Sequence, residues 1–237
     1  MIILAHDFET TGLDTATCGV VQYAIGILGV TDDDEVHLLE KHVSLCNPGE
    51  PIPADCTKVH GITDADVVGA NHYMSELGEL YKQLFDKYDI AAVMGYNNRE
   101  YDDRIARRCG MPKCHSLDLY DYGRELKDRK VIEKAKLTVL YAHFAKQPLS
   151  GAHDAWVDID ACIQLLPHLS VEFGHSTVAE MIEYTTPKVD LNIITSFGKH
   201  KGTPVGQLPS RYIKWLLNNT YHLPRDFVAT LRAMRGE

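Results

Sequence analysis

Two acidic residues stand one residue apart in the segment HDFETTGLD (6–14), directly after an apolar run over residues 1–5. The apolar run predicts a buried strand. Successive side chains of a strand point to opposite faces, so Asp7 and Glu9 should point to the same side. Two neighbouring carboxylates at the end of a buried strand are costly, because burial and mutual repulsion both disfavour their charged forms. A positive group must therefore offset them.

A third carboxylate is expected on the core side of a helix. In the helix predicted over residues 99–109, Asp102 shares a face with apolar residues at i+3, i+4 and i+7. The neighbouring Asp103 shares a different face with Arg107 at i+4, and we interpret these two as an ordinary solvent-exposed ion pair. Asp102 alone is thus predicted to point inward.

A fourth carboxylate and a histidine occur together in the segment GAHDAWVDIDACIQLLPHL (151–169). Asp158 falls on the apolar face of the helix predicted over 154–169, and Asp154 is placed to cap that helix. On a helix, His153 and Asp158 would lie about 140° apart, so we place His153 in the preceding loop. A loop histidine beside metal-bound water could accept a proton near neutral pH.

Together, the four carboxylates predict a metal site. Oxygen-only ligands select hard cations, and four carboxylates balance the charge of two divalent ions, Mg²⁺ or Mn²⁺. Paired metals stabilise the attacking and the leaving oxygens in phosphodiester cleavage. Taken singly, each acid could be a cap, a turn residue or a surface residue. Their placement on one strand end and two apolar helix faces favours the metal site. The four are Asp7, Glu9, Asp102 and Asp158.

The elements that must position these residues predict an α/β fold. The chain has 237 residues, of which 45% are hydrophobic, enough for one large domain with a small appendage. Three strands come first and a fourth follows later, which predicts a sheet with a leading meander. These strands are expected at 1–8, 19–30, 35–46 and 90–97, and helices at 75–88, 99–109, 119–128, 136–145 and 154–169.

Charge is distributed unevenly along the chain. The formal net charge is −9, yet residues 187–237 contain eight Lys and Arg against three acids. An acidic body with a basic tail fits a metal-binding catalytic domain attached to a nucleic-acid grip. The alternative is a chance imbalance in a small domain.

The cysteines and the hydropathy pattern suggest a cytoplasmic protein without a membrane partner. The six cysteines form no C-x-x-C pair, so we interpret them as reduced thiols. Cys109, Cys114 and His115 could form a metal cluster, but buried or incidental residues are the favoured interpretation. No apolar run approaches the length of a membrane span, and no secretory signal is expected at the N-terminus.

The order of these motifs resembles the DnaQ-like (DEDDh) 3′–5′ exonucleases. The motif D-x-E-T corresponds to residues 7–10, and Asn98 with Asp102 matches the second motif. The third motif, H-x-A-x-x-D, corresponds to residues 153–158, and its histidine is typical of the DEDDh branch. The resemblance covers about residues 1–170. It implies a ribonuclease H-like mixed sheet flanked by helices.

The resemblance also implies a role for each catalytic residue. Asp7, Glu9 and Asp158 would hold the catalytic metal, and Asp7 and Asp102 would hold the second one. His153 would deprotonate the attacking water, which would cleave the last phosphodiester and release a 5′-mononucleotide.

Further residues are implied to bind the substrate. The backbone from Thr10 to Leu13 would receive the 3′-OH of the terminal nucleotide, and Asn98 is included with this group. The segment VHGIT (59–63) matches a substrate-side motif, in which His60 would border the bases. The alternative for His60 is a turn histidine ahead of a helix cap.

Resemblance also divides the chain into domains. Segments around the three motifs resemble bacterial exonuclease I, whereas FGKHKGTPVGQLPSRYIKWLLNN (197–219) resembles the small C-terminal domain of bacterial exonuclease X. We therefore expect an exonuclease X-like architecture. Its parts are an exonuclease domain over 1–172, a linker helix over 173–190 and a basic hairpin-plus-helix domain over 191–237.

The basic tail offers candidate phosphate contacts. Glycines bracket Lys199 and Lys201 at the tip of an expected hairpin, and Arg211 lies on the following helix. Trp215 could stack on a base, but its helical spacing with Leu216 favours a place in the core.

These features predict a 3′–5′ exonuclease acting on single-stranded DNA ends with two Mg²⁺ or Mn²⁺ ions. The alternatives are an exoribonuclease that trims single-stranded RNA, an inactive nucleic-acid-binding module and a phosphatase with a nucleophilic aspartate. The inactive module should lack a ligand, and the phosphatase would not explain His153. The sequence does not distinguish repair, proofreading and recycling of DNA, and it indicates no oligomeric state.

Overall fold

The computed structural model describes residues 1–219 and 223–236. The chain divides into two compact units, Met1–Thr185 and Thr186–Glu237, and each is described by itself. The finer division with a separate linker helix over 173–190 stays a prediction. Part of the predicted C-terminal domain, residues 220–222 and 237, lies outside the described residues.

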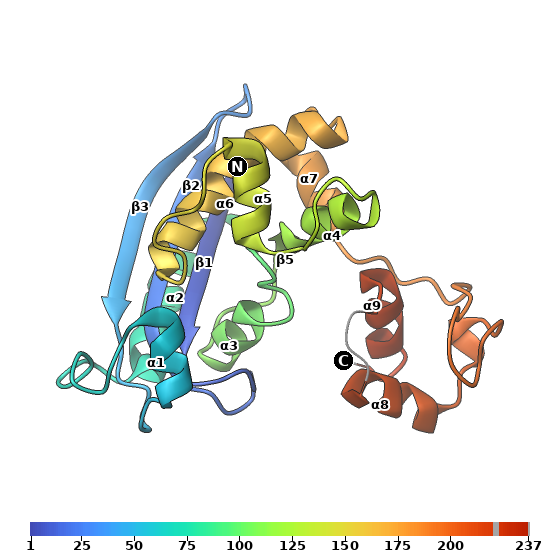
Figure 1. Cartoon of the computed structure of the whole chain (residues 1–237), viewed down its shortest axis with the longest axis horizontal. Helices are drawn as coiled ribbons and strands as arrows, with labels where there is room; N and C mark the ends of the chain where they lie inside the picture. The colour runs from blue at the N-terminus through green and yellow to red at the C-terminus, as the bar shows by residue number, and fades with distance from the viewer. Residues whose placement is uncertain (220–222, 237) are drawn as a thin grey trace. The chain divides into compact units, whose positions relative to one another are not determined.

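The first unit is built on a five-stranded mixed sheet (Figure 1). Its strands are β1 (Ile2–Thr10), β2 (Val20–Val30), β3 (Val36–Leu45), β4 (Ile90–Gly95) and β5 (His115–Asp118). In the order β3-β2-β1-β4-β5, the first three strands pair antiparallel, whereas β1, β4 and β5 run parallel. The predicted α/β sheet with a leading meander is therefore confirmed. No sequence pattern predicts β5, because four residues are too few to show a period.

Helices flank both faces of this sheet. They are α1 (Ala54–His60), α2 (Tyr73–Lys87), α3 (Asp102–Arg108), α4 (Tyr120–Asp128), α5 (Leu137–Ala145), α6 (Ala155–Phe173) and α7 (Val178–Thr185). The helices predicted at 75–88, 99–109, 119–128, 136–145 and 154–169 each have a counterpart, from α2 to α6. Helix α1 has no predicted counterpart; it ends at Gly61, whose φ of 78° closes it in the left-handed conformation.

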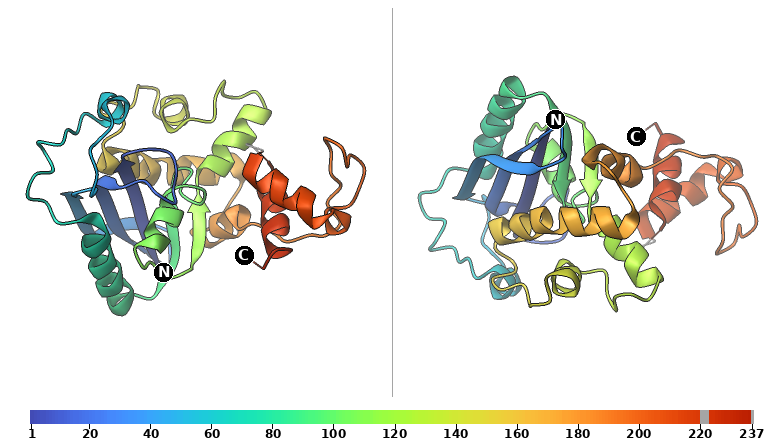
Figure 2. Two further views of the ribbon diagram at one scale, coloured as in Figure 1. Left: turned by 90° about the horizontal axis from the view of Figure 1, so that it is seen from below. Right: turned by 90° about the horizontal axis from the view of Figure 1, so that it is seen from above.

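The alternation of side chains along β1 divides the core between two helices. Ile3 and Ala5 belong to a buried cluster with α6, whereas Leu4 and Phe8 belong to a cluster with α2. Figure 2 shows these two helices on opposite faces of the sheet. Because side chains alternate with period two, residues 7 and 9 continue the α6 side.

The second unit has a small core of its own. A bridge between Ile194 and Pro204 closes a loop, and η1 (Val205–Gln207), α8 (Ser210–Asn219) and α9 (Arg225–Ala233) follow. Apolar side chains from these segments form one buried cluster. In the described part of the chain, no helix combines the length and the apolar composition needed to cross a bilayer.

Candidate active site

The first two carboxylates lie on the stretch of β1 that runs beyond its parallel neighbour. The pairing of β1 with β4 ends at Ala5, whereas the pairing with β2 continues through Asp7 and Glu9. Strand β1 is therefore paired on one side only where the acids stand. Glu9 is 8% exposed, so its carboxylate lies at the edge of the core rather than in solvent.

Helix α3 occupies the side of β1 that β4 leaves open. The backbone N–H of Phe8 donates to Oδ1 of Asp102 at 3.1 Å. Asp102 is the first residue of α3 and is 4% exposed. A strand amide without a sheet partner thus holds the Asp102 carboxylate against β1, where Asp7 is close enough to repel it.

A buried polar link holds α3 against β1. His6 is fully buried; its Nδ1 lies 2.9 Å from the Tyr81 hydroxyl and its Nε2 lies 2.8 Å from Oδ1 of Asp103. Burial by itself would raise the pKa of Asp103, but the hydrogen bond and the charge of His6 hold it below its usual value. The link thus joins His6, which precedes Asp7, to Asp103, which follows Asp102.

The prediction that Asp103 is exposed to solvent is therefore wrong, although its predicted pairing with Arg107 is present. Arg107 does approach Asp103, at 3.7 Å, but Asp103 is 2% exposed and its principal partner is His6. The i+4 spacing describes the helix surface correctly. It carries no information about a histidine 97 residues away along the chain.

Asn98 also belongs to this buried link. Its Nδ2 donates to Oδ1 of Asp103 at 2.9 Å and to Oγ of Ser116 at 3.0 Å, and the residue is fully buried. These contacts give Asn98 a structural role, and the substrate contact expected of it stays a prediction. Asn98 connects α3 to β5.

The buried link gives a stability prediction. Asp103→Ala removes the acceptor of the buried His6, and breaking such a pair costs about 3–5 kcal/mol. The melting temperature should fall by roughly 6 °C or more in a chain of this size. Arg107→Ala is the control, because Arg107 is 40% exposed and its pair with Asp103 should contribute under about 1 kcal/mol. Equal melting temperatures for the two variants would contradict the assignment.

The start of α6 brings the fourth carboxylate and the histidine to the same place. Asp154 caps the helix: its Oδ1 accepts from the N–H groups of Trp156 and Val157, each at 3.1 Å. His153 precedes it in a turn with φ of 70°, and its backbone N–H donates to Oδ2 of Asp158 at 3.3 Å. His153 therefore lies in the loop, as its spacing predicts.

Gln22 connects this helix start to the strand that carries the acids. Gln22 is the antiparallel partner of Glu9 on β2. Its Nε2 donates to Oδ2 of Asp154 at 3.2 Å, and its Oε1 accepts from the N–H of Ala155 at 3.1 Å. A single amide thus sets the distance between Glu9 and the residues at the start of α6. The sequence gives no sign of this role, because it depends on the strand register.

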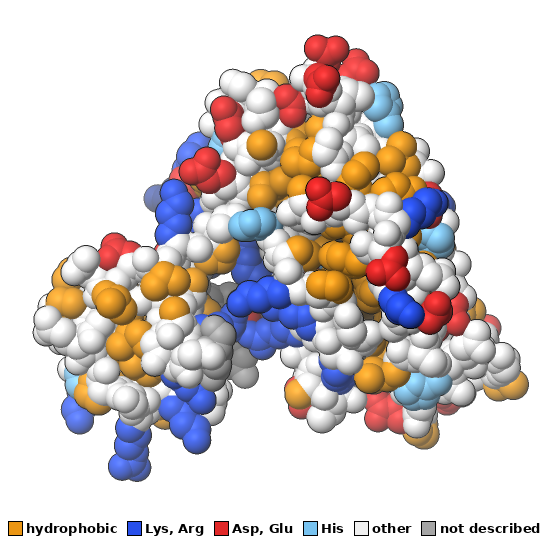
Figure 3. All heavy atoms as spheres, turned by 180° about the vertical axis from the view of Figure 1, so that it is seen from behind, with side chains coloured by type: hydrophobic (Ala, Val, Ile, Leu, Met, Phe, Trp, Pro, Cys, Tyr) orange, Lys and Arg blue, Asp and Glu red, His pale blue; other side chains and the backbone are white. Residues whose placement is uncertain are grey.

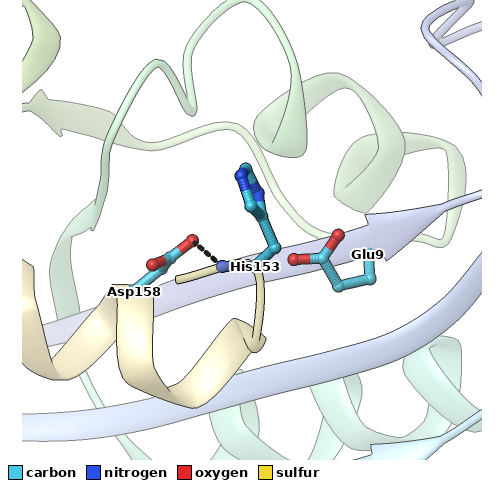
Figure 4. A group of neighbouring side chains, drawn as sticks. All are labelled: Glu9, His153 and Asp158. Carbon is cyan, nitrogen blue, oxygen red and sulfur yellow. Dashed lines mark hydrogen bonds between the residues drawn. The ribbon is translucent and has the colours of Figure 1, made fainter. Parts of the chain in front are cut away.

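Three of the predicted side chains meet closely. Ligand atoms of Glu9, His153 and Asp158 all lie within 4.8 Å of one another. Figure 4 shows them on β1, on the loop before α6 and on α6 itself. Asp7 and Asp158 also line one small pocket, with Tyr96 and Cys162 among its other walls.

Burial raises the pKa of all four acids, and repulsion from other members of the group adds to it for Asp7, Glu9 and Asp102. Burial raises the pKa of Glu9 to about 9, and repulsion from Asp7 and Asp158 adds to it. Burial also raises the pKa of Asp7 well above its usual range, with Asp158 as the next cause. For Asp102, burial comes first and Asp7 second. Asp158 is raised by burial, which the backbone N–H of His153 partly offsets.

This set of residues fits a divalent cation. Oδ1 of Asp158 is buried without a hydrogen-bond partner, which is costly unless another group binds it. Within the described residues, no Lys or Arg forms an ion pair with any of the four acids. Carboxylate oxygens suit Mg²⁺ and Mn²⁺. A cation would satisfy the orphaned oxygen and relieve the repulsion.

The remaining predicted substrate residues lie at different places. His60 is close to the Thr10 backbone and to His153; burial lowers its pKa most, and His153 adds to that effect. Leu13, on the loop after β1, is 91% exposed. Lys199, Lys201 and Arg211 are exposed residues of the second unit.

The structure also reveals a contact that the sequence does not predict. The Tyr101 hydroxyl, at the start of α3, contacts Oγ1 of Thr10 and donates to the carbonyl of Gly12. It therefore fastens the loop after β1. This is the loop whose backbone is predicted to receive the end of the substrate.

Sequence comparisons relate this chain to known exonucleases. Residues 4–166 match the family RNase T, which is described as exonuclease. Over 109 residues, the chain is 36% identical to a DNA polymerase III subunit epsilon-like protein of Rhodobacter capsulatus. That match covers 46% of this chain and 14% of the relative.

Solved structures of exonuclease I have a similar fold. One, described in connection with processivity, has a TM-score of 0.62 at 18% identity and covers 84% of this chain and 49% of its own. The zinc-bound complex of Escherichia coli exonuclease I with single-stranded DNA has a TM-score of 0.58 at 21% identity, covering 81% and 46%. This chain spans about half the length of these structures. By its sequence over residues 4–166, the chain belongs to the RNase T family of exonucleases.

Proposed function

We propose that this exonuclease hydrolyses the terminal phosphodiester of single-stranded DNA at its 3′ end and releases 5′-mononucleotides. The observation that carries the proposal is the group of four desolvated, mutually repelling carboxylates, one of which has a buried oxygen without a partner. The charged form of such a group is unfavourable unless bound cations offset it, and otherwise the acids hold protons. Structural neighbours include E. coli exonuclease I bound to dT13 and dA16 oligonucleotides, which favours DNA as the substrate.

The chain's own residues divide the work. Asp7, Glu9 and Asp158 would hold one divalent ion, and Asp7 and Asp102 a second. When bound, the ions would supply charge stabilisation for the attacking and leaving oxygens. Asp102 is fixed for this task by the Phe8 amide. The exposed loop after β1, with Leu13 at its surface, would receive the terminal nucleotide.

His153 would accept the proton of the attacking water. Its backbone is held against Asp158, yet the residue is exposed, so the imidazole can reach solvent. Its left-handed φ restricts the substitutions that keep the loop intact, and asparagine is among the residues that tolerate this conformation.

His153→Asn should therefore lower the rate of cleavage by about 10² to 10⁴-fold, the usual contribution of a general base. The rise in melting temperature on adding Mg²⁺ should stay as in the wild type. Rates come from single-turnover cleavage, and melting temperatures from thermal unfolding with and without the ion. If the ion no longer stabilised the variant, His153 would be a metal ligand rather than the base.

The test of the function itself is a gel assay on the purified chain. Single-stranded DNA, duplex DNA and RNA of one sequence are labelled at the 5′ end and, separately, at the 3′ end. We expect a ladder from 5′-labelled single-stranded DNA in Mg²⁺ or Mn²⁺, labelled mononucleotide from the 3′-labelled strand, and no cleavage in EDTA. Faster cleavage of RNA would make the protein an exoribonuclease. Binding without cleavage of any strand would indicate an inactive module.

A further inference from the structure

Trp215 of the second unit is exposed, contrary to the core position that its spacing favours. Its neighbours Ile213 and Leu216 on α8 are buried in the unit's apolar cluster, whereas Trp215 is 52% exposed. A large aromatic side chain that could have been buried, and is not, leaves an apolar face in water. Such a face is a candidate for binding a partner.

Trp215 is the end of a row of three rings. The rings of Tyr212 and Trp215 are stacked, with centroids 5.8 Å apart and planes at 12°. The ring centroid of His200 lies 4.5 Å from that of Tyr212. His200 comes from the loop that the bridge between Ile194 and Pro204 closes. Gly198 permits this contact: it has φ of 66°, and a Cβ there would approach the Tyr212 hydroxyl to 2.5 Å. The loop and α8 therefore form one aromatic surface.

Uncompensated positive charge surrounds this row. Four cations from the same loop and helix are exposed, and none of them forms an ion pair within residues 1–219 and 223–236: Lys199, Lys201, Arg211 and Lys214. The two acids described in this unit have other partners. Asp226 accepts from the Lys188 N–H and pairs with Arg225, and Asp190 accepts from the Asn192 N–H. Figure 3 shows several Lys and Arg side chains projecting from this unit.

We propose that His200, Tyr212 and Trp215, with the four surrounding cations, bind single-stranded DNA. Unpaired bases stack on aromatic rings, and Lys and Arg bind the phosphates. A duplex does not expose the faces of its bases, so this surface should prefer a single strand. The choice of DNA as occupant rests on the function proposed for the first unit. The binding surface itself rests on residues of the second unit alone.

The test measures binding by the full chain in EDTA, so that the result does not depend on cleavage. The probe is a fluorescein-labelled dT20, followed by anisotropy. Trp215→Ala should weaken binding about tenfold, because it removes the ring on which one base stacks. Trp215→Phe should recover most of the affinity. The control is Val189→Ala, since Val189 is 58% exposed on the same unit and lies outside the row of rings.

A second measurement addresses the cations. Replacing Lys201 and Arg211 with Ala should reduce the dependence of log affinity on log salt by about 0.7 for each lost phosphate contact to a single strand.

Equal affinities of the Trp215→Ala and Val189→Ala variants for dT20 would overturn the proposal. The proposal would also be overturned if Trp215→Ala weakened the binding of duplex DNA as much as it weakened the binding of dT20. Trp215-dependent binding of U20 RNA without that of dT20 would overturn the choice of DNA. Failure of the proposed function would show separately, as wild-type protein that binds dT20 but cleaves nothing in Mg²⁺.

Discussion

Asp7→Asn should abolish cleavage and, in the absence of divalent ions, make the protein more stable. Asp7 is placed to bind both proposed ions, so its loss should lower the cleavage rate by about 10³-fold or more. Burial, and then repulsion from Asp158 and Asp154, raise the pKa of Asp7 well above its usual range. The unfolded chain carries Asp7 ionised at neutral pH and the folded state disfavours that form, so the acid opposes folding; a neutral amide of the same shape removes this cost.

Two measurements check this prediction together. Single-turnover cleavage gives the loss of activity, and thermal unfolding in EDTA at pH 8 should show a melting temperature at least about 3 °C higher than that of the wild type. Asp160→Asn is the matched control, because Asp160 is an exposed acid of helix α6 whose carboxylate accepts a hydrogen bond from Gln164. It should change neither quantity. Wild-type cleavage by the Asp7 variant would exclude the proposed mechanism, and a lower melting temperature would show that the charge is compensated.

Local sequence patterns were sufficient to predict which way the acidic side chains of β1 and α3 point. The period of two along β1 predicts that Asp7 and Glu9 face one side, and the register of the sheet has them facing α6. Helical periodicity predicts that Asp102 points inward, and it is 4% exposed. The orientation of these side chains could be predicted because strands and helices impose fixed periods on neighbouring side chains.

Contacts between distant segments could not be predicted in this way. His6 and Asp103 are 97 residues apart, and Gln22 and Asp154 are 132 apart. Each pair forms only because the sheet order and the strand register bring two elements together. A local pattern also failed for Trp215, since its helical spacing with Leu216 cannot distinguish the edge of a buried face from the exposed face beside it. The burial of Asp103 and the exposure of Trp215 are thus properties of the tertiary fold.

The stability of the metal-free protein should fall as the pH rises, and divalent cations should reverse this loss. The pKa of Glu9 is about 9 in the folded protein, against an ordinary value of 4.5. Below pH 4.5 the residue is protonated in both states and contributes nothing. Between 4.5 and 9 the unfolded chain has released this proton while the folded chain still holds it. Folding then takes up a proton, so each increase in pH favours the unfolded state.

A bound cation has the opposite effect on the dependence of stability on pH. It requires ionised carboxylates, so its binding displaces the protons that Glu9 and its neighbours hold, and it competes better as the pH rises. Thermal unfolding from pH 6 to 9 should show a falling melting temperature in EDTA. In saturating Mg²⁺ or Mn²⁺ the curve should be flatter, with a stabilisation of about 2–3 kcal/mol at a hundredfold excess over the dissociation constant.

Glu9→Gln separates this effect from general acid or alkaline denaturation. The glutamine cannot titrate, so the variant in EDTA should lose less stability between pH 6 and 9 than the wild type does. Its gain from Mg²⁺ should also be smaller, because one ligand carries no charge. A cation-induced rise in melting temperature that is equal at pH 6 and pH 9 would mean that the ion binds elsewhere. In that case the repulsion among the four carboxylates would have to be relieved by their own protons, and the site could not hold the two ions of the proposed mechanism.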